Sequence, residues 1–240
     1  MPHTLFISDL HLCASRPQIN ALFFKFLNTT ALSAEALYVL GDLFEYWPGD
    51  DDLEEPLHTE VAAAFSRLKE AGVRLYLMHG NRDFLMGEAF CKAAGMIMLT
   101  DPALIDLYGT PTLLMHGDTL CTDDVHYQTF RTQVRSADWQ NTFLDKPLAE
   151  RKAIIEGMRS KSREAQAEKP DEILDVNPLA VQEALRAHGY PRLIHGHTHR
   201  PAKHLHAIDG KTCERWVLTD WYSHGGYLRC DRNGCEMFTI

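Results

Sequence analysis

The stretch Thr4-Leu5-Phe6-Ile7-Ser8-Asp9-Leu10-His11 decides the fold, because a short apolar run ends directly in polar residues. Runs of this length and composition are typical of buried strands. The pattern recurs, and we expect strands at residues 4–8, 37–40, 74–78, 112–115 and 192–194. Between the first four, apolar residues at helical spacing predict helices near residues 19–31, 56–71 and 85–94. This alternation favours an α/β fold with a layered core.

The C-terminal end departs from the alternation. Strand-like runs occupy residues 216–219, 227–230 and 236–240, and glycine-containing turns separate them. Because no helical segment lies between these runs, we expect this end of the chain to be antiparallel.

The alternation of strands and helices is also interrupted by a helical segment at residues 123–170. It shows no strand signal and carries apolar residues at helical spacing. Positions 131–169 hold nine basic and six acidic residues, a net of +3, on a chain whose formal charge is -9. We therefore expect a core built from residues 1–122 and 171–240, with residues 123–170 inserted as a helical cap.

The composition is that of an ordinary folded protein. The chain has 240 residues, of which 45% are hydrophobic and 24% charged, so disorder is excluded. Its negative charge argues against a nucleic-acid partner. The N-terminus lacks the features of a signal peptide and no run is long enough to span a bilayer, so we expect a cytoplasmic protein. The six cysteines form no Cys-x-x-Cys pair, which predicts reduced thiols rather than disulfides or a zinc knuckle.

Each expected strand of the core is followed by a residue type that binds metals. Carboxyl ends of strands in an open α/β sheet gather around one crevice, so we expect these side chains to converge. In chain order they are Asp9, His11, Asp42, Asn81, His116, His197 and His199.

Each of these residues taken alone has a structural interpretation as a helix cap, a turn residue or a hydrogen-bonded core histidine. Chance pairs also occur, as in Asp124-Val125-His126 and His204-Leu205-His206. Recurrence at five strand ends favours a metal site. Two carboxylates, one amide and four imidazoles exceed the needs of one tetrahedral ion, so two metals with a bridging aspartate are expected. Two divalent ions less two carboxylates leave a charge of about +2, which suits hydrolysis of a phosphoester or diphosphate.

Five short motifs resemble those of the calcineurin-like metallophosphoesterases: Asp9-Leu10-His11, Gly41-Asp42, Gly80-Asn81-Arg82-Asp83, His116-Gly117-Asp118 and Gly196-His197-Thr198-His199. Longer stretches, at residues 41–45, 79–85, 116–124 and 194–201, resemble the UDP-2,3-diacylglucosamine pyrophosphatases of lipid A synthesis within that superfamily. The resemblance implies a four-layer αββα sandwich with a helical cap. It further implies two Mn²⁺ ions, with Zn²⁺ or Fe²⁺ less favoured, and cleavage of UDP-2,3-diacylglucosamine to UMP and 2,3-diacylglucosamine 1-phosphate by attack at the uridyl phosphorus.

The same resemblance implies roles for individual residues. One metal would be held by Asp9, His11, Asp42 and His199, and the other by Asp42, Asn81, His116 and His197. The catalytic residues would be Asp42, Asn81, Arg82 and His116. Substrate contacts would come from Asn81, Arg82, Asp124, Ser162, Gln166, Lys169 and His197, with Gln166 standing where an asparagine is common.

Arg82 follows the Gly-Asn pair where many members of the superfamily have a histidine. Arginine is not a useful proton donor. A phosphate monoester leaves without such help, so Arg82 fits a diphosphate substrate better than an alkyl phosphate. The alternative is a structural pairing of Arg82 with Asp83 or another carboxylate. In the same way, Asp50-Asp51-Asp52 either belongs to a family signature or is a solvated loop.

The expected partners are the lipid substrate and the anionic inner-membrane surface, touched peripherally on its cytoplasmic face by the basic cap. No obligate protein partner is implied. Two other functions remain open. One is a phosphoesterase acting on nucleotides, protein phosphoserine or cyclic phosphodiesters, which would not need a cap. The other is a protein-interaction scaffold, which would ordinarily have lost several of the seven ligands.

Overall fold

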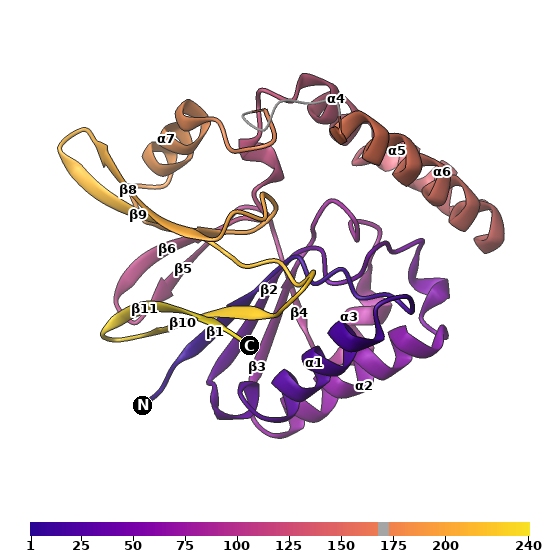
Figure 1. Cartoon of the computed structure of the whole chain (residues 1–240), viewed down its shortest axis with the longest axis horizontal. Coiled ribbons are helices and arrows are strands. Elements are labelled where there is room, and N and C mark those ends of the chain that lie inside the picture. Colours follow the sequence, from indigo (N-terminus) through magenta and orange to yellow (C-terminus); the bar gives the residue numbers. More distant parts are fainter. Residues whose placement is uncertain (168–172) are drawn as a thin grey trace.

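The computed structural model describes residues 1–167 and 173–240, and it consists of two β-sheets with helices on both outer faces (Figure 1). The six-stranded sheet has the order β11 (Gly234–Thr239), β10 (Gly226–Asp231), β1 (Thr4–Ile7), β2 (Ala36–Leu40), β3 (Arg74–Met78) and β4 (Ile97–Leu99). The five-stranded sheet has the order β5 (Ala103–Leu107), β6 (Thr110–Leu114), β7 (Arg192–His195), β9 (Lys211–Val217) and β8 (Ala202–Ile208).

Three helices cover the outer face of the six-stranded sheet: α1 (Pro17–Asn28), α2 (Pro56–Glu70) and α3 (Glu88–Ala94). Successive side chains of a strand point to opposite faces, so Leu5 and Ile7 of β1 face these helices while Phe6 faces the second sheet. Phe23 of α1 and Phe65 of α2 fill the layer between helices and sheet, with ring centroids 5.6 Å apart.

The two sheets pack through an aromatic and aliphatic layer. Tyr38 of β2 stacks between Phe6 and Tyr76, at centroid distances of 5.0 and 4.4 Å. Leu114 and Ile194 meet this layer from the second sheet. On that sheet's outer face, α7 (Pro178–Ala187) packs its apolar side against the strands. The expected four-layer αββα sandwich is thus confirmed.

Three further helices follow β6 and its loop, in the segment expected to be helical: α4 (Val125–Val134), α5 (Ala137–Leu144) and α6 (Leu148–Ala167). The carboxylate of Asp124 accepts a hydrogen bond from the Tyr127 backbone at the start of α4, and the Ser136 hydroxyl does the same for Trp139 at the start of α5. Figure 1 shows the three helices as a row set apart from the sheets. No described helix is both long and apolar enough to cross a membrane.

Several expectations about the elements were incomplete or wrong. β4, β5, β8 and α7 were not predicted. The run at residues 216–219 overlaps β9, which pairs antiparallel with β8 but in parallel with β7. The expected antiparallel arrangement therefore holds for β8 with β9 and for β10 with β1 and β11, and fails between β7 and β9. The prediction that all cysteines are reduced was wrong for Cys230 and Cys235, which form a disulfide. The turn between β10 and β11 places these two residues directly opposite each other. The absence of a Cys-x-x-Cys pair was therefore a poor guide, because strand pairing brings the two sulfur atoms together.

Candidate metal centre

The loops after β1, β2, β3, β6 and β7 meet at one end of the sandwich and bring all seven expected ligands together. Asn81 connects the loops: its Oδ1 lies 3.0 Å from His116 Nε2 and 2.9 Å from His197 Nδ1. His199 Nε2 lies 3.4 Å from Asp9 Oδ1. Side chains from positions more than 180 residues apart therefore share one cluster, as the strand-end rule predicts.

The cluster contains two overlapping groups of ligand atoms. Asp9, His11 and His199 form one group and Asp9, Asp42 and His116 the other, and in each the ligand atoms lie within 4.8 Å of one another. Asp42 also spans both sides, because its Oδ2 lies 3.8 Å from His11 Nε2 and 3.9 Å from His116 Nε2. Two neighbouring metal positions with shared carboxylates are compatible with this arrangement.

Five of the seven ligand residues have a left-handed backbone, with φ values between 49° and 71°: Asp9, His11, Asp42, His197 and His199. Residues other than glycine rarely adopt this conformation, which costs on the order of 1–3 kcal/mol each. The conformation is held by neighbouring loops, since Asp9 N donates to Gly41 O at 3.1 Å and His11 N to Asp42 O at 2.9 Å. Strain concentrated on the ligand residues marks this end as the functional one.

Glycines allow the loops to approach this closely. Gly41 has a φ of +92°, and a Cβ there would lie 2.6 Å from the Cα of Gly80. A Cβ at Gly196 would collide with Ser8 and Asp9. The Gly-Asp glycine is therefore required by contact with another backbone, and the Gly-His glycine by contact with the side chains of the first strand's loop, so that the residues beside them can lie close together.

Burial and neighbouring charges set the protonation of the cluster. Burial raises the pKa of Asp42 to about 7. Burial opposes protonation of His116, but the carboxylates of Asp42 and Asp118 outweigh it and raise its pKa to about 9. Burial lowers the pKa of His197 to about 4 and that of His11 well below its usual value. His11 and His197 are thus neutral near pH 7, the state in which an imidazole binds a metal.

The residues fit a pair of divalent ions. Asp9 Oδ1 and His11 Nδ1 are buried and lack a hydrogen-bond partner within the described part of the chain, an arrangement that is costly unless something else satisfies them. His116 Nδ1 donates to Leu40 O at 2.9 Å, which turns its Nε2 toward the other candidate ligands Asn81 and Asp42. Mixed imidazole, carboxylate and amide donors suit Mn²⁺, Fe²⁺ or Zn²⁺.

The cluster forms the floor of a cavity of about 590 Å³. Ligands and Arg82 provide the polar floor. The walls are largely apolar and come mainly from the loop after β3 and from α4, α5, α6 and the segment before α7: Phe84, Leu85, Phe130, Trp139, Phe143, Ile155, Met158, Ile173 and Leu174. A polar floor beneath apolar walls suits a substrate that has an anionic group at one position and apolar groups elsewhere.

Four of the seven residues expected to contact substrate lie at the cavity. Asn81, Arg82, Asp124 and His197 line the cavity. The other three follow further along the chain: Ser162 and Gln166 fall in the C-terminal turns of α6, and Lys169 lies outside the described residues.

Arg82 is not paired with the residue that follows it. Asp83 accepts from Gly80 N at 2.7 Å and from Leu43 N at 2.8 Å, so its carboxylate ties the Gly-Asn loop to the Gly-Asp loop. The Arg82 backbone is itself held by Asp42 Oδ1, at 2.8 Å. Its side chain lines the cavity, as a contact to an anionic substrate requires.

The acidic run at residues 50–52 is built into the fold and is not a solvated loop. Asp50 accepts from Gly87 N and Ala89 N, both at 2.8 Å, at the start of α3. Asp52 is buried and pairs with Lys152 of α6 at 2.6 Å.

Sequence reasoning missed three residues close to the ligands. Asp118 is buried, accepts hydrogen bonds from the Tyr127 hydroxyl and Arg131 Nε at 2.7 Å each, and faces His116. Glu45 lies beside His11 and pairs with Arg159 of α6. Tyr222 packs against two ligand histidines. Asp118 and Glu45 stand inside motifs quoted above, whereas nothing in the sequence marks Tyr222.

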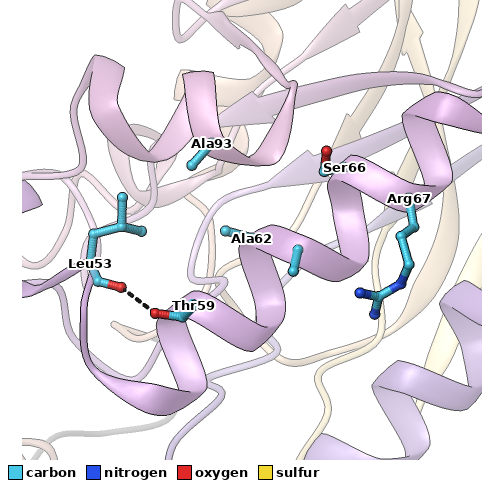
Figure 2. Close-up of a pocket in the computed structure, with 7 residues that line it drawn as sticks. Leu53, Thr59, Ala62, Ser66, Arg67 and Ala93 are labelled. Carbon is cyan, nitrogen blue, oxygen red and sulfur yellow. Dashed lines mark hydrogen bonds between the residues drawn. The ribbon is translucent and has the colours of Figure 1, made fainter.

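A second hollow, of about 420 Å³, lies between α2 and α3 (Figure 2). Small side chains such as Ala62 and Ala93 line it, and Thr59 donates its hydroxyl hydrogen to Leu53 O at 2.8 Å. Arg67 is its only charged lining residue. The hollow has no cluster of groups able to bind a metal or transfer a proton, so the cavity above the strand ends is the candidate site.

Comparison with known proteins agrees with this geometry. The family model described as calcineurin-like phosphoesterase matches residues 2–201. A protein of Aromatoleum aromaticum named UDP-2,3-diacylglucosamine hydrolase is 56% identical over 96% of this chain and 94% of its own length. Proteins of that name from Aeromonas hydrophila and Serratia proteamaculans are 54% and 48% identical, over 95% and 98% of this chain and 94% and 98% of theirs. This chain belongs to the UDP-2,3-diacylglucosamine hydrolase family of the calcineurin-like phosphoesterases.

Proposed function

We propose that the protein hydrolyses UDP-2,3-diacylglucosamine to UMP and 2,3-diacylglucosamine 1-phosphate in lipid A biosynthesis. The observation that carries the proposal is the cluster of seven candidate metal-binding side chains, five of which line the floor of a cavity with apolar walls. A diphosphate bearing acyl chains fits both parts of that cavity. Relatives at about half identity carry the name of this activity.

The metal centre is proposed to hold two ions, with Mn²⁺ favoured over Zn²⁺ and Fe²⁺. Asp9, His11, Asp42 and His199 would hold one, and Asp42, Asn81, His116 and His197 the other. When bound, the ions supply positive charge and lower the pKa of water. The buried carboxylates and neutral imidazoles of the chain hold that charge at a fixed place on the cavity floor.

Arg82, Asn81, Asp42 and His116 form the proposed catalytic set. The Arg82 backbone is fixed by its bond to Asp42, and the Arg82 side chain lines the cavity. There the guanidinium offers hydrogen-bond donors to phosphate oxygens, whose charge grows as the bond breaks. The lipid phosphate leaves as a weakly basic group, so no proton needs to come from Arg82.

Residues 123–170 are proposed to act as a cap over the core formed by residues 1–122 and 171–240. Helices α4, α5 and α6 contribute apolar walls that would hold the acyl chains. Asp124, Ser162, Gln166 and Lys169 are proposed to lie beside the sugar and phosphates. The basic character of this segment would also favour peripheral contact with an anionic membrane surface on its cytoplasmic face.

The test is to compare hydrolysis of UDP-2,3-diacylglucosamine with that of soluble nucleotides, cyclic phosphodiesters and phosphopeptides. The lipid substrate should be preferred, and in ¹⁸O-water the label should enter UMP while the lipid phosphate stays unlabelled. Label in the lipid phosphate would contradict attack at the uridyl phosphorus. Faster turnover of a soluble phosphoester would instead favour a phosphoesterase that acts on nucleotides, phosphoserine or cyclic phosphodiesters.

A further inference from the structure

Tyr222 occupies a fixed position at one side of the cavity. The preceding residue, Trp221, is fully buried in the core beneath α1, where its Nε1 donates to Gly226 O at 3.1 Å. Trp221 N also donates to Asp9 O at 3.0 Å, which ties this loop to the first ligand. Because Trp221 is anchored inward, its neighbour Tyr222 is directed outward and lines the cavity.

The Tyr222 ring lies against ligands of one metal. Its centroid is 5.3 Å from that of His11, in a stacked arrangement, and 5.3 Å from that of His199. The Arg16 guanidinium also lies over the ring, 4.9 Å from its centroid. Even with these contacts, 46% of Tyr222 is exposed. A large aromatic surface is thus presented next to the centre, and the packing of the core does not require it to be there.

A second tyrosine near the ligands provides a contrast. Tyr127 of α4 stacks on His197 at 5.9 Å, on the other side of the ligand cluster. Its hydroxyl donates to Asp118 at 2.7 Å, and the residue is only partly exposed at the edge of the same cavity. Tyr127 is therefore tied at its polar end to Asp118, whereas nearly half of the surface of Tyr222 is exposed.

The cavity walls divide by chemistry in a way that matches the two halves of the proposed substrate. The wall formed by α4, α5 and α6 is aliphatic and aromatic and suits acyl chains. Tyr222 belongs to a different part of the chain, the loop between β9 and β10, and adjoins His11 and His199 at the core. Arg82, the proposed phosphate-binding group, lines the same cavity as Tyr222. A nucleoside attached to the phosphate needs a flat partner near the phosphate and away from the acyl chains.

Resting on the function proposed above, we infer that Tyr222 is the stacking platform for the nucleobase of the substrate, so that the uridine half lies on the His11 and His199 side of the cavity. Stacking on an aromatic side chain is available to any base, because every base has a π-face. Tyr222 would therefore provide affinity for the nucleoside, and discrimination between bases would come from other groups.

The test measures binding of UMP and of ribose 5-phosphate, which lacks the base, to the metal-loaded protein by calorimetry. Tyr222→Ala should weaken UMP binding by about 10-fold and leave ribose 5-phosphate within twofold. Tyr222→Phe should bind UMP like the wild type, because the ring is retained. Tyr190→Ala, which removes a tyrosine between α7 and β7 that does not line the cavity, is the matched control. Metal content, measured by elemental analysis, should be unchanged in all variants.

Equal weakening of UMP and ribose 5-phosphate, or loss of metal, would mean that Tyr222 only supports His11 and His199, and the inference would be wrong. Unchanged UMP binding in Tyr222→Ala would also overturn it. The proposed function fails separately, if the wild type does not hydrolyse UDP-2,3-diacylglucosamine. If the wild type hydrolyses this substrate but Tyr222→Ala binds UMP as tightly as the wild type does, the proposed function stands and only the stacking role of Tyr222 is refuted.

Discussion

The loops that form the floor of the cavity and helices α4, α5 and α6, which form its roof, are held in opposite ways. The floor is made of short loops joined through their backbones, as in the bonds from Asp9 N to Gly41 O and from Gly196 N to His116 O. Its ligand residues are mostly buried and several are conformationally strained. Such loops have no room to adjust, because a shift of one requires a shift of all.

Long cationic side chains attach the roof to the core, in addition to apolar contacts such as that of buried Phe143. Arg151 of α6 donates to Pro48 O at 2.6 Å and pairs with Asp51, Lys152 pairs with Asp52, and Arg159 reaches Glu45. Long side chains adjust their rotamers at small cost compared with a strained backbone. From this contrast we expect mutations in the floor to affect the chemical step and mutations in the roof to affect substrate binding.

The largest expected effect is at the floor, from Asp42→Ala. This carboxylate lies between His11 and His116 and holds the Arg82 backbone. Its loss should lower kcat by about 10³-fold or more, because several kcal/mol of charge stabilisation depend on the site it completes. Turnover and metal content are measured together, with the exposed Asp138→Ala of α5 as control. Full activity after Asp42→Ala, or after exhaustive removal of metal, would refute the metal centre.

A pair of glycine substitutions compares the two regions directly. Gly41→Ala places a side chain at a φ of +92° and 2.6 Å from the Gly80 backbone. It should lower the free energy of unfolding by about 3 kcal/mol, since strain and a backbone clash add. Gly157→Ala, in the middle of α6, meets nothing within 4 Å and should raise it by about 0.5–1 kcal/mol.

Urea denaturation of both variants measures the difference, and activity at low temperature shows whether folded Gly41→Ala still binds metal. Both substitutions add one methyl group. If they changed the free energy of unfolding by the same amount and in the same direction, floor and roof would be equally tolerant of a glycine replacement. That result would contradict the distinction drawn between them.

The parts of the fold that were predictable are those whose sequence pattern has a single explanation. β1, β2 and β3 are continuous apolar runs because both faces of the sheet are covered, by helices on one side and the second sheet on the other. β8 was missed because four of its seven residues are exposed and three are lysine or histidine, and β4 because it has three residues. The start of α7 was detectable, since Asn177 before Pro178 is a strong cap signal and its side chain does accept from Leu179 and Ala180.

The site was predictable where its residues follow strands directly. His116 and His197 are each within two residues of a strand end, so sheet geometry alone brings them together. Tyr222 and Glu45 reach the ligands through loop conformations that depend on buried neighbours such as Trp221. Long-range packing decides the contacts of Tyr222, whereas the Cys230–Cys235 disulfide depends on the register of a local hairpin turn.

The smallest expected effect is at the roof. Met158 lines the cavity from α6, whereas Leu148, at the start of the same helix, does not. Met158→Ser should raise KM for the diacyl substrate about 5- to 10-fold, because part of a side chain's 1.5–3 kcal/mol of burial free energy is lost, and should leave kcat and a short-chain analogue nearly unchanged. Leu148→Ser, the matched control, should not distinguish the two substrates. Equal effects of Met158→Ser on both substrates, with the melting temperature falling in step, would show that Met158 only packs α6 against the core. In that case the roof, like the floor, would belong to the fixed part of the enzyme, because its apolar wall would stabilise the fold and would not select the substrate.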